Sequence, residues 1–325
     1  MNDPTPNALR KKLRAADIQP FVYDINLILT ALSAENLRPS TRDNYESDLK
    51  IFASWLVLYT KGNTFRDVEP DTVRLFVEFM KNQLLLLPNT INGYLAAIRK
   101  MYAVVQQREV SKRILPDLVV DTHLPYVPSI EQVGRMLDAC RTHRELLFVA
   151  MMISTGMRLC ELLNLHFRDI LRDRKVIYIS TSKGRTDGYV PLTDRVLEVL
   201  TLYCRSYNSA HPDKPLSPDH YVFFSSGPET PENPGRIRRM YYELKKSAGL
   251  AEEPFNVHST RHYFALNLYL QSHDPLLVKN ALRQKTYAAT EKYVRLAVTI
   301  EAQARYTNPG DIAFGKSRIH SEPET

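Results

Sequence analysis

Apolar side chains recur at helical spacing through the first third of the chain. Between about residues 21 and 108 they fall three or four positions apart, so that each group lines one face of a helix. The clearest groups are Tyr45, Leu49, Phe52 and Leu56; Val73, Phe76, Phe79 and Met80; and Ile91, Tyr94, Leu95, Ile98, Met101 and Tyr102. This pattern predicts an all-helical domain over residues 21–108.

The segments on either side of this domain lack such a pattern. Residues 1–20 are polar, basic and contain proline, which predicts a loosely held arm. Residues 109–128 contain three prolines and no helical period, which predicts an extended linker. The polar residues 308–325 are expected to form a tail that is free or docked on another molecule.

A second domain with mixed periodicity is predicted over residues 129–307. Two extended segments, Lys175–Ser180 and Gly188–Leu192, flank a turn and predict a hairpin with Lys183 at its tip. Helical patterns surround them at 129–141, 143–155, 193–208, 235–248, 259–272, 275–284 and 288–297. The predicted fold is therefore mainly α with a small antiparallel β-sheet, in two domains.

Composition and charge narrow the class of protein. Apolar residues make up 44% and charged residues 24%, as in ordinary globular proteins. The net charge of +7 favours a polyanionic partner such as nucleic acid or an acidic membrane surface. Cys140, Cys160 and Cys204 are odd in number and widely spaced, which argues against a disulfide framework or a structural zinc site. No signal peptide or membrane span is evident, so we expect a soluble intracellular protein.

Four short clusters carry residues suited to phosphate chemistry. Arg158 precedes Glu161 by one helical turn, so the carboxylate can orient the guanidinium. His258 and Arg261 stand three positions apart at a predicted helix start and can face one site. Lys183 occupies the hairpin tip.

The fourth cluster runs from Leu282 to Tyr293 and includes Gln284. Taken singly, each cluster has an ordinary structural explanation: a surface ion pair, a solvated lysine, a capping histidine and a core tyrosine.

Together and in this order, the clusters resemble the tyrosine recombinase, or phage integrase, family. That family has TGxRxxEL, a hairpin lysine, HxxRH and LGHxxxxTTxxY, which appear here as TGMRLCEL, SKG, HSTRH and LRQKTYAATEKY. The resemblance covers Ser129 to Tyr293. More loosely it extends back to Phe21, because STRDNYESDLKIFASWL and NTINGYLAAIRKMY look like the family's core-binding domain.

The resemblance implies a role for each matched residue. Arg158 and Arg261 would clamp the scissile phosphate, and Tyr293 would attack it to form a 3′-phosphotyrosyl link. Lys183 would protonate the departing 5′-oxygen, and His258 would handle the proton of the tyrosine. No metal or other cofactor is expected.

Supporting and divergent positions follow from the same match. Glu161 and His262 are assigned supporting roles, His262 as a structural residue. Gln284 stands where the family usually has His or Trp, and Arg283 replaces the usual glycine. A glutamine can still donate an N–H to a phosphate oxygen but carries no charge.

The same resemblance implies how DNA is held. The two domains would form a clamp around double-stranded DNA, with Arg42, Arg99 and Lys100 of the helical domain facing phosphates or the major groove. A dimer would occupy one recombination site and a tetramer two, with accessory proteins as further partners, in the cytoplasm at the nucleoid. Two alternatives remain: a strand-relaxing enzyme like the type IB topoisomerases, and a catalytically weakened DNA-binding protein of the same fold. Integration, excision, transposition and resolution all remain open as the biological role.

Overall fold

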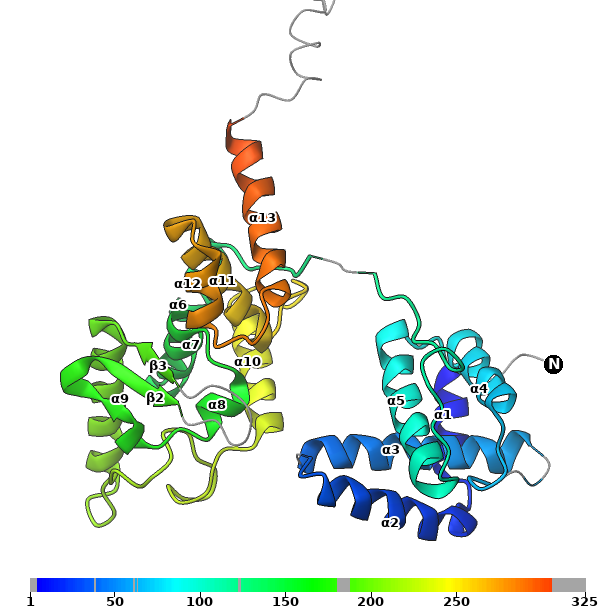
Figure 1. Cartoon of the computed structure of the whole chain (residues 1–325). Helices are drawn as coiled ribbons and strands as arrows, with labels where there is room; N and C mark the ends of the chain where they lie inside the picture. Colours follow the sequence, from blue (N-terminus) through cyan, green and yellow to red (C-terminus); the bar gives the residue numbers. More distant parts are fainter. Residues whose placement is uncertain are drawn as a thin grey trace, which may run out of the picture. The chain divides into compact units, whose positions relative to one another are not determined.

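The computed structural model describes residues 5–37, 39–60, 62, 64–121, 124–179 and 188–305, with side chains to residue 300. The chain divides into two compact units, Met1–Thr122 and His123–Thr325 (Figure 1). Each unit has a hydrophobic core of its own. The predicted fold class, mainly helical with one small antiparallel sheet, is confirmed.

The described part of the first unit is all-helical. Its helices are α1 (Pro6–Arg14), α2 (Gln19–Ala34), α3 (Pro39–Tyr59), α4 (Pro70–Asn82) and α5 (Pro88–Val105). Helix α3 packs against α1, α2 and α5. Phe52, Trp55 and Phe76 come from the predicted stripes or their neighbours, and their rings meet in the centre of the core. Helices α4 and α5 begin at prolines, which suit the first turn because its N–H groups have no helical partner.

Two expectations for this unit are wrong. The expected loose arm over residues 1–20 is wrong for its described part, because residues 6–14 form α1 and bury Leu9 and Leu13 against the core. These leucines, four positions apart, share one helical face among the basic residues. Residues 109–128 are not a free linker throughout, because Val110 and Leu115 are buried in the same core. The side chain of Asn92 also fixes this segment, since it hydrogen-bonds to both the N–H and the carbonyl of Leu118.

The second unit combines a small sheet with helices. Strands β1 (Ile170–Leu171), β2 (Val176–Ile179) and β3 (Gly188–Pro191) are antiparallel in the order β1-β2-β3. The predicted hairpin is present, with Tyr178 opposite Tyr189. Its tip, with Lys183, lies outside the described residues. The helices are α6 (Ile130–Asp138), α7 (His143–Thr155), α8 (Leu159–Leu163), α9 (Asp194–Ala210), α10 (Pro234–Ser247), α11 (Val257–Ser272), α12 (Pro275–Ala281) and α13 (Ala288–Arg305).

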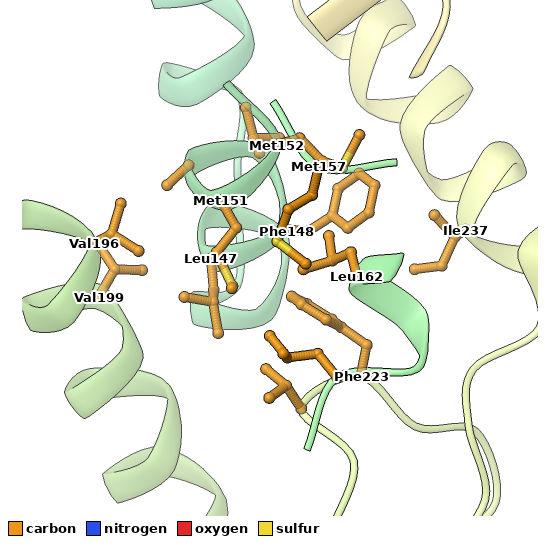
Figure 2. Close-up of a cluster of buried hydrophobic side chains, with 14 of the residues drawn as sticks. Leu147, Phe148, Met151, Met152, Met157, Leu162, Val196, Val199, Phe223 and Ile237 are labelled. Atoms are coloured by element: carbon orange, nitrogen blue, oxygen red, sulfur yellow. The ribbon is translucent and has the colours of Figure 1, made fainter. Parts of the chain in front are cut away.

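Helix α7 is central to the core of this unit. It packs against α6, α9 and α11, and its buried side chains occur on nearly every face. Figure 2 shows Leu147, Phe148 and Met151 of α7 between the valines of α9 and residues Phe223 and Ile237.

Helix α7 ends at Gly156, which adopts the left-handed conformation with φ of 57°. A Cβ atom at Gly156 would lie 3.0 Å or less from Phe264 and Leu282, so that a side chain here would clash as well as strain the backbone. The glycine therefore allows α7 to end against α11, with Arg158 two residues later.

Candidate active site

Arg261 is the fifth residue of α11 and, among the described basic residues of the predicted site, is the most deeply buried, at 2% exposure. Its side chain donates to the carbonyl of Gly156 and, at 2.6 Å, to that of Leu282, so it joins the ends of α7 and α12. Burial and, to a smaller extent, the charge of Arg158 lower the pKa of Arg261 to about 10. The guanidinium therefore remains charged at neutral pH and is held in one orientation.

Arg158 caps the short helix α8 together with Glu161. The backbone N–H of Arg158 donates to Glu161 Oε2 at 2.9 Å, and its Nη1 donates to Oε1 at 2.7 Å. Burial raises the pKa of Glu161, but the hydrogen bond from the Arg158 backbone and the charge of Arg283 outweigh this, so the pKa is lowered. The predicted contact between the Glu161 carboxylate and the Arg158 guanidinium is present.

Arg283 is the third member of this cluster, a contact that the sequence did not reveal. Its Nη2 donates to Glu161 Oε2 at 2.7 Å, and both side chains are at most 7% exposed. The residue follows the C-cap of α12 in the left-handed conformation, with φ of 51°. Glycine suits this conformation far better than a residue with a Cβ. The motif showed that an arginine replaces the usual glycine here, but not which group the arginine contacts.

Tyr293 lies in α13 and is 1% exposed. Its phenol oxygen is 2.8 Å from Nδ1 of His262, one turn after His258 on α11. Burial raises the pKa of Tyr293 to about 12, although the charges of Arg261 and Arg158 lower it in part. The tyrosine is therefore protonated at neutral pH, and the positive charges of both guanidinium groups act on it.

The two histidines do not lie as the sequence suggested. His262, assigned a structural role, contacts the phenol, whereas His258 packs edge-to-face on the His262 ring at 4.8 Å between centroids. Burial lowers the pKa of His262 to about 3, and the charge of Lys292 contributes to this shift. Lys292 also lies over the Tyr293 ring, 5.1 Å from its centroid, and was not singled out from the sequence. The four-residue spacing of the histidines could have indicated that they share a helix face.

Gln284 follows α12, and its side chain lies next to the start of α13. Its Oε1 accepts a hydrogen bond of 2.7 Å from the hydroxyl of the fully buried Thr290. This bond links the end of α12 to the helix of Tyr293.

A cavity of about 480 Å³ opens between α10 and the first turn of α11. Among its lining residues are His258, Arg238, Tyr242 and Lys245. Arg238 and Tyr242 lie on the exposed face of α10, together with Arg236 and Arg239. A basic surface with an aromatic side chain therefore lies directly beside His258.

The three basic residues expected to face DNA from the first unit are already engaged within that unit. Arg99 is paired with Asp117 at 2.7 Å and also donates to the carbonyl of Leu115. Lys100 is paired with Glu35, and Arg42 donates to the Ser33 hydroxyl. Each of the three side chains therefore has a polar partner within the first unit and does not need a DNA phosphate as its partner.

Among the described residues, no three or more His, Cys, Asp or Glu side chains come together as a metal site. None of the helices described here is long and apolar enough to cross a membrane.

Comparison with known proteins assigns the family. Residues 129–299 match the model of the phage integrase family, and residues 25–109 match the phage integrase N-terminal SAM-like domain. The chain belongs to the phage integrase family. It is a site-specific tyrosine recombinase that binds DNA recombination sites and cleaves and rejoins DNA.

Individual proteins of similar sequence are also named as integrases or recombinases. It is 26% identical over 228 residues to a putative integrase/recombinase, y4qK, of Sinorhizobium fredii, covering 70% of this chain and 71% of that protein. It is 25% identical over 277 residues to tyrosine recombinase XerC of Psychromonas ingrahamii, covering 81% and 88%.

Solved structures share the fold. XerH recombinase bound to a palindromic difH substrate has a TM-score of 0.65 at 18% identity, covering 92% of this chain and 93% of that one. The Tn1549 transposon integrase bound to transposon right end DNA also has a TM-score of 0.65, at 15% identity, covering 87% and 99%.

Proposed function

We propose that this recombinase cleaves DNA with the phenol oxygen of Tyr293, forming a 3′-phosphotyrosyl bond while the bond from phosphorus to the 5′-oxygen breaks. The released 5′-hydroxyl, or that of a partner strand, then attacks the same phosphorus and frees the tyrosine. The phosphodiester energy is kept in the covalent link, so no nucleotide cofactor is consumed. The hydrogen bond between Tyr293 and His262, within the field of two arginines, is the observation that carries this proposal.

Arg158 and Arg261 stabilise the negative charge that builds on the non-bridging oxygens. Planar guanidinium groups offer paired N–H donors, which match two phosphate oxygens. Arg261 is held by two backbone carbonyls and Arg158 by Glu161, so neither has to reorganise when the charge develops.

Proton transfer requires a base at the phenol and an acid at the leaving oxygen. His262 is neutral at physiological pH because its pKa is low, so its Nδ1 accepts the phenol proton as the oxygen attacks. Lys183, outside the described residues, is the proposed acid for the 5′-oxygen. His258 is the proposed donor to a phosphate oxygen, which its exposure at the edge of the cavity supports.

DNA reaches this site over the exposed face of α10. Arg236, Arg238 and Arg239 place positive charge there, and Tyr242 adds an aromatic surface, as expected for a nucleic-acid contact. We further propose a dimer on each recombination site and a tetramer on two sites. The lambda integrase fragment of similar fold was solved as a dimer on a core site, which supports the first of these steps.

The test is covalent trapping on a nicked duplex. DNA flanking the gene, especially inverted repeats with a short spacer, supplies the candidate sites, and the adduct is detected on a denaturing gel. We expect an adduct with the wild type and none with Tyr293→Phe. Tyr287→Phe is the control, because Tyr287 belongs to the same motif and is 50% exposed, and it should still form the adduct. An adduct that persists in Tyr293→Phe contradicts the assigned nucleophile.

Two other outcomes would support the alternatives, a catalytically weakened DNA-binding protein and a strand-relaxing enzyme. Binding without any adduct on every flanking site indicates a catalytically weakened DNA-binding protein. Relaxation of supercoiled DNA by a monomer, without strand exchange between sites, indicates a topoisomerase-like activity.

A further inference from the structure

Arg283 occupies a backbone position that disfavours its residue type. It follows α12 with φ of 51°, and the N–H groups of Arg283 and Gln284 bond back to the carbonyls of Asn280 and Lys279. This is the helix ending at which glycine is usual, because a Cβ is strained at positive φ. The strain is offset only if the side chain makes contacts that glycine cannot make.

The contacts of Arg283 join three segments of the proposed active site. Its Nη2 bonds to Glu161 Oε2 at 2.7 Å, its Nη1 bonds to the carbonyl of Ala281 at 3.1 Å, and its alkyl stem packs on Gly188 at the start of β3. The side chain is 5% exposed. Burial of a guanidinium at this depth requires a charged partner, which Glu161 supplies.

Glu161 is thereby divided between two arginines. Its Oε1 accepts from the Arg158 side chain, whereas Oε2 accepts from the Arg158 backbone and from Arg283. With only one side-chain bond to the carboxylate, Arg158 keeps its other N–H groups for the phosphate. Two arginines and one carboxylate also leave the cluster with a net positive charge, which a single Arg158–Glu161 pair would lack.

We propose that Arg283 is a positioning residue of the recombinase: it shares the Glu161 carboxylate, so that Arg158 is held by one bond and stays available to the scissile phosphate. This inference rests on the role proposed above for Arg158. Arg283 also places a positive charge at the position before Gln284, whose own side chain is uncharged.

The test compares three variants in single-turnover cleavage of the nicked duplex at saturating protein. Arg283→Met removes the charge at similar length, and its cleavage rate is expected to fall roughly tenfold to a hundredfold, the equivalent of one charge-assisted hydrogen bond. Arg283→Lys restores part of the rate. Arg283→Gly relieves the backbone strain, so it is expected to be more stable than Arg283→Met but equally slow.

Two further readouts separate positioning from a merely structural role. The Arg283 charge lowers the pKa of Glu161, so in Arg283→Met the cleavage rate should fall off on the acid side at a higher pH than in the wild type. Affinity for the duplex should stay within about threefold, because the bulk of the phosphate contacts remain. Arg195→Met is the matched control: it removes the same charge from a side chain 84% exposed on α9 and should change neither readout.

The background of Glu161→Gln provides the decisive comparison. If Arg283 acts through Glu161, Arg283→Met should slow this variant much less than it slows the wild type. An undiminished effect means that Arg283 acts on DNA directly and overturns the proposal. The proposal is also overturned if both Arg283→Met and Arg283→Gly cleave within about twofold of the wild-type rate. Absence of any adduct with the wild type would instead contradict the proposed function itself.

Discussion

The phenol oxygen of Tyr293 lies 2.8 Å from Nδ1 of His262, in a setting where both groups are neutral at physiological pH. Burial raises the pKa of Tyr293 to about 12 and lowers that of His262 to about 3. The phenol is therefore the donor and Nδ1 the acceptor, which places the remaining ring proton of the histidine on Nε2. The proposed nucleophile and its proposed proton acceptor are thus hydrogen-bonded to each other in the protein without DNA.

Replacing this acceptor should slow the attack of the phenol. In His262→Phe a flat aromatic ring is kept but the base is lost, so formation of the covalent adduct should slow by about a hundredfold, a typical contribution of a general base. The measurement is the single-turnover rate on the nicked duplex. If His262→Phe cleaves at the wild-type rate and His258→Phe forms no adduct, the proton acceptor is His258 and not His262.

The low pKa of His262 also predicts how stability depends on pH. In the unfolded chain a histidine takes up its proton near pH 6.5, whereas in the folded protein this happens only near pH 3. Between these values the unfolded state binds the extra proton, so stability should fall as the pH falls from about 6.5 towards 3.

Thermal unfolding measured between pH 7 and pH 4 checks this expectation. The decrease in Tm should be smaller in His262→Phe than in the wild type, whatever the difference between them at pH 7. Tyr293→Phe keeps the histidine and should retain most of the pH dependence. Identical slopes for His262→Phe and the wild type would show that His262 is not held neutral.

Gln284→His restores the side chain that the family pattern usually has at this position. A histidine there can still accept the hydrogen bond from Thr290 through a ring nitrogen, and it adds a group that can donate to a phosphate oxygen. Strand joining should therefore be unchanged or faster. A complete loss of joining, with normal folding and DNA binding, would show that Gln284 does not occupy the matching position.

The contacts of Arg99 predict an effect on stability rather than on DNA binding. Arg99→Ala leaves the Leu115 carbonyl without its side-chain donor and Asp117 with Lys112 as its remaining partner, so the first unit should lose about 1–3 kcal/mol of unfolding free energy. Arg238→Ala, on the exposed face of α10, should instead weaken DNA binding and reduce its salt dependence by about one phosphate contact. Denaturant unfolding and binding titrations at several salt concentrations distinguish the two, and the reverse pattern would place DNA on the first unit at Arg99.

The burial of Leu13 predicts that the N-terminal helix is part of the first core. Leu13 is 1% exposed, so Leu13→Ala should lower the unfolding free energy by about 2–5 kcal/mol. Leu75→Ala is the matched control on α4, where the side chain is 59% exposed, and should change it by about 0.5 kcal/mol or less. Equal stability of the two variants would mean that α1 is not docked.

Local signals in the sequence were sufficient for the elements and for the order of the motifs. Apolar stripes around Phe52 and Ile98 predicted buried helix faces, and the β-like run around Ile177 predicted a strand, because such patterns depend only on neighbours along the chain. Arg158 and Glu161 could be paired for the same reason, since three positions on a helix turn bring them together. The assignment of the family rests on features of this kind.

Contacts between distant segments could not be predicted in this way. Arg283 reaches Glu161 across 122 positions of sequence, and His262 reaches Tyr293 across 31. Arg99 meets Asp117 only because the segment after α5 folds back onto that helix. Such pairings depend on where helices end and how they pack, which a pattern of single residues does not encode.

The sequence by itself therefore determined which side chains this recombinase offers to the proposed phosphate site: two arginines, a histidine and a tyrosine in a fixed order. The tertiary structure decided which of them touch: it placed His262 rather than His258 on the phenol and divided Glu161 between two arginines. The physical reason is that chemistry belongs to the residue type, whereas hydrogen bonds and pKa shifts depend on distances and burial that exist only in the packed chain.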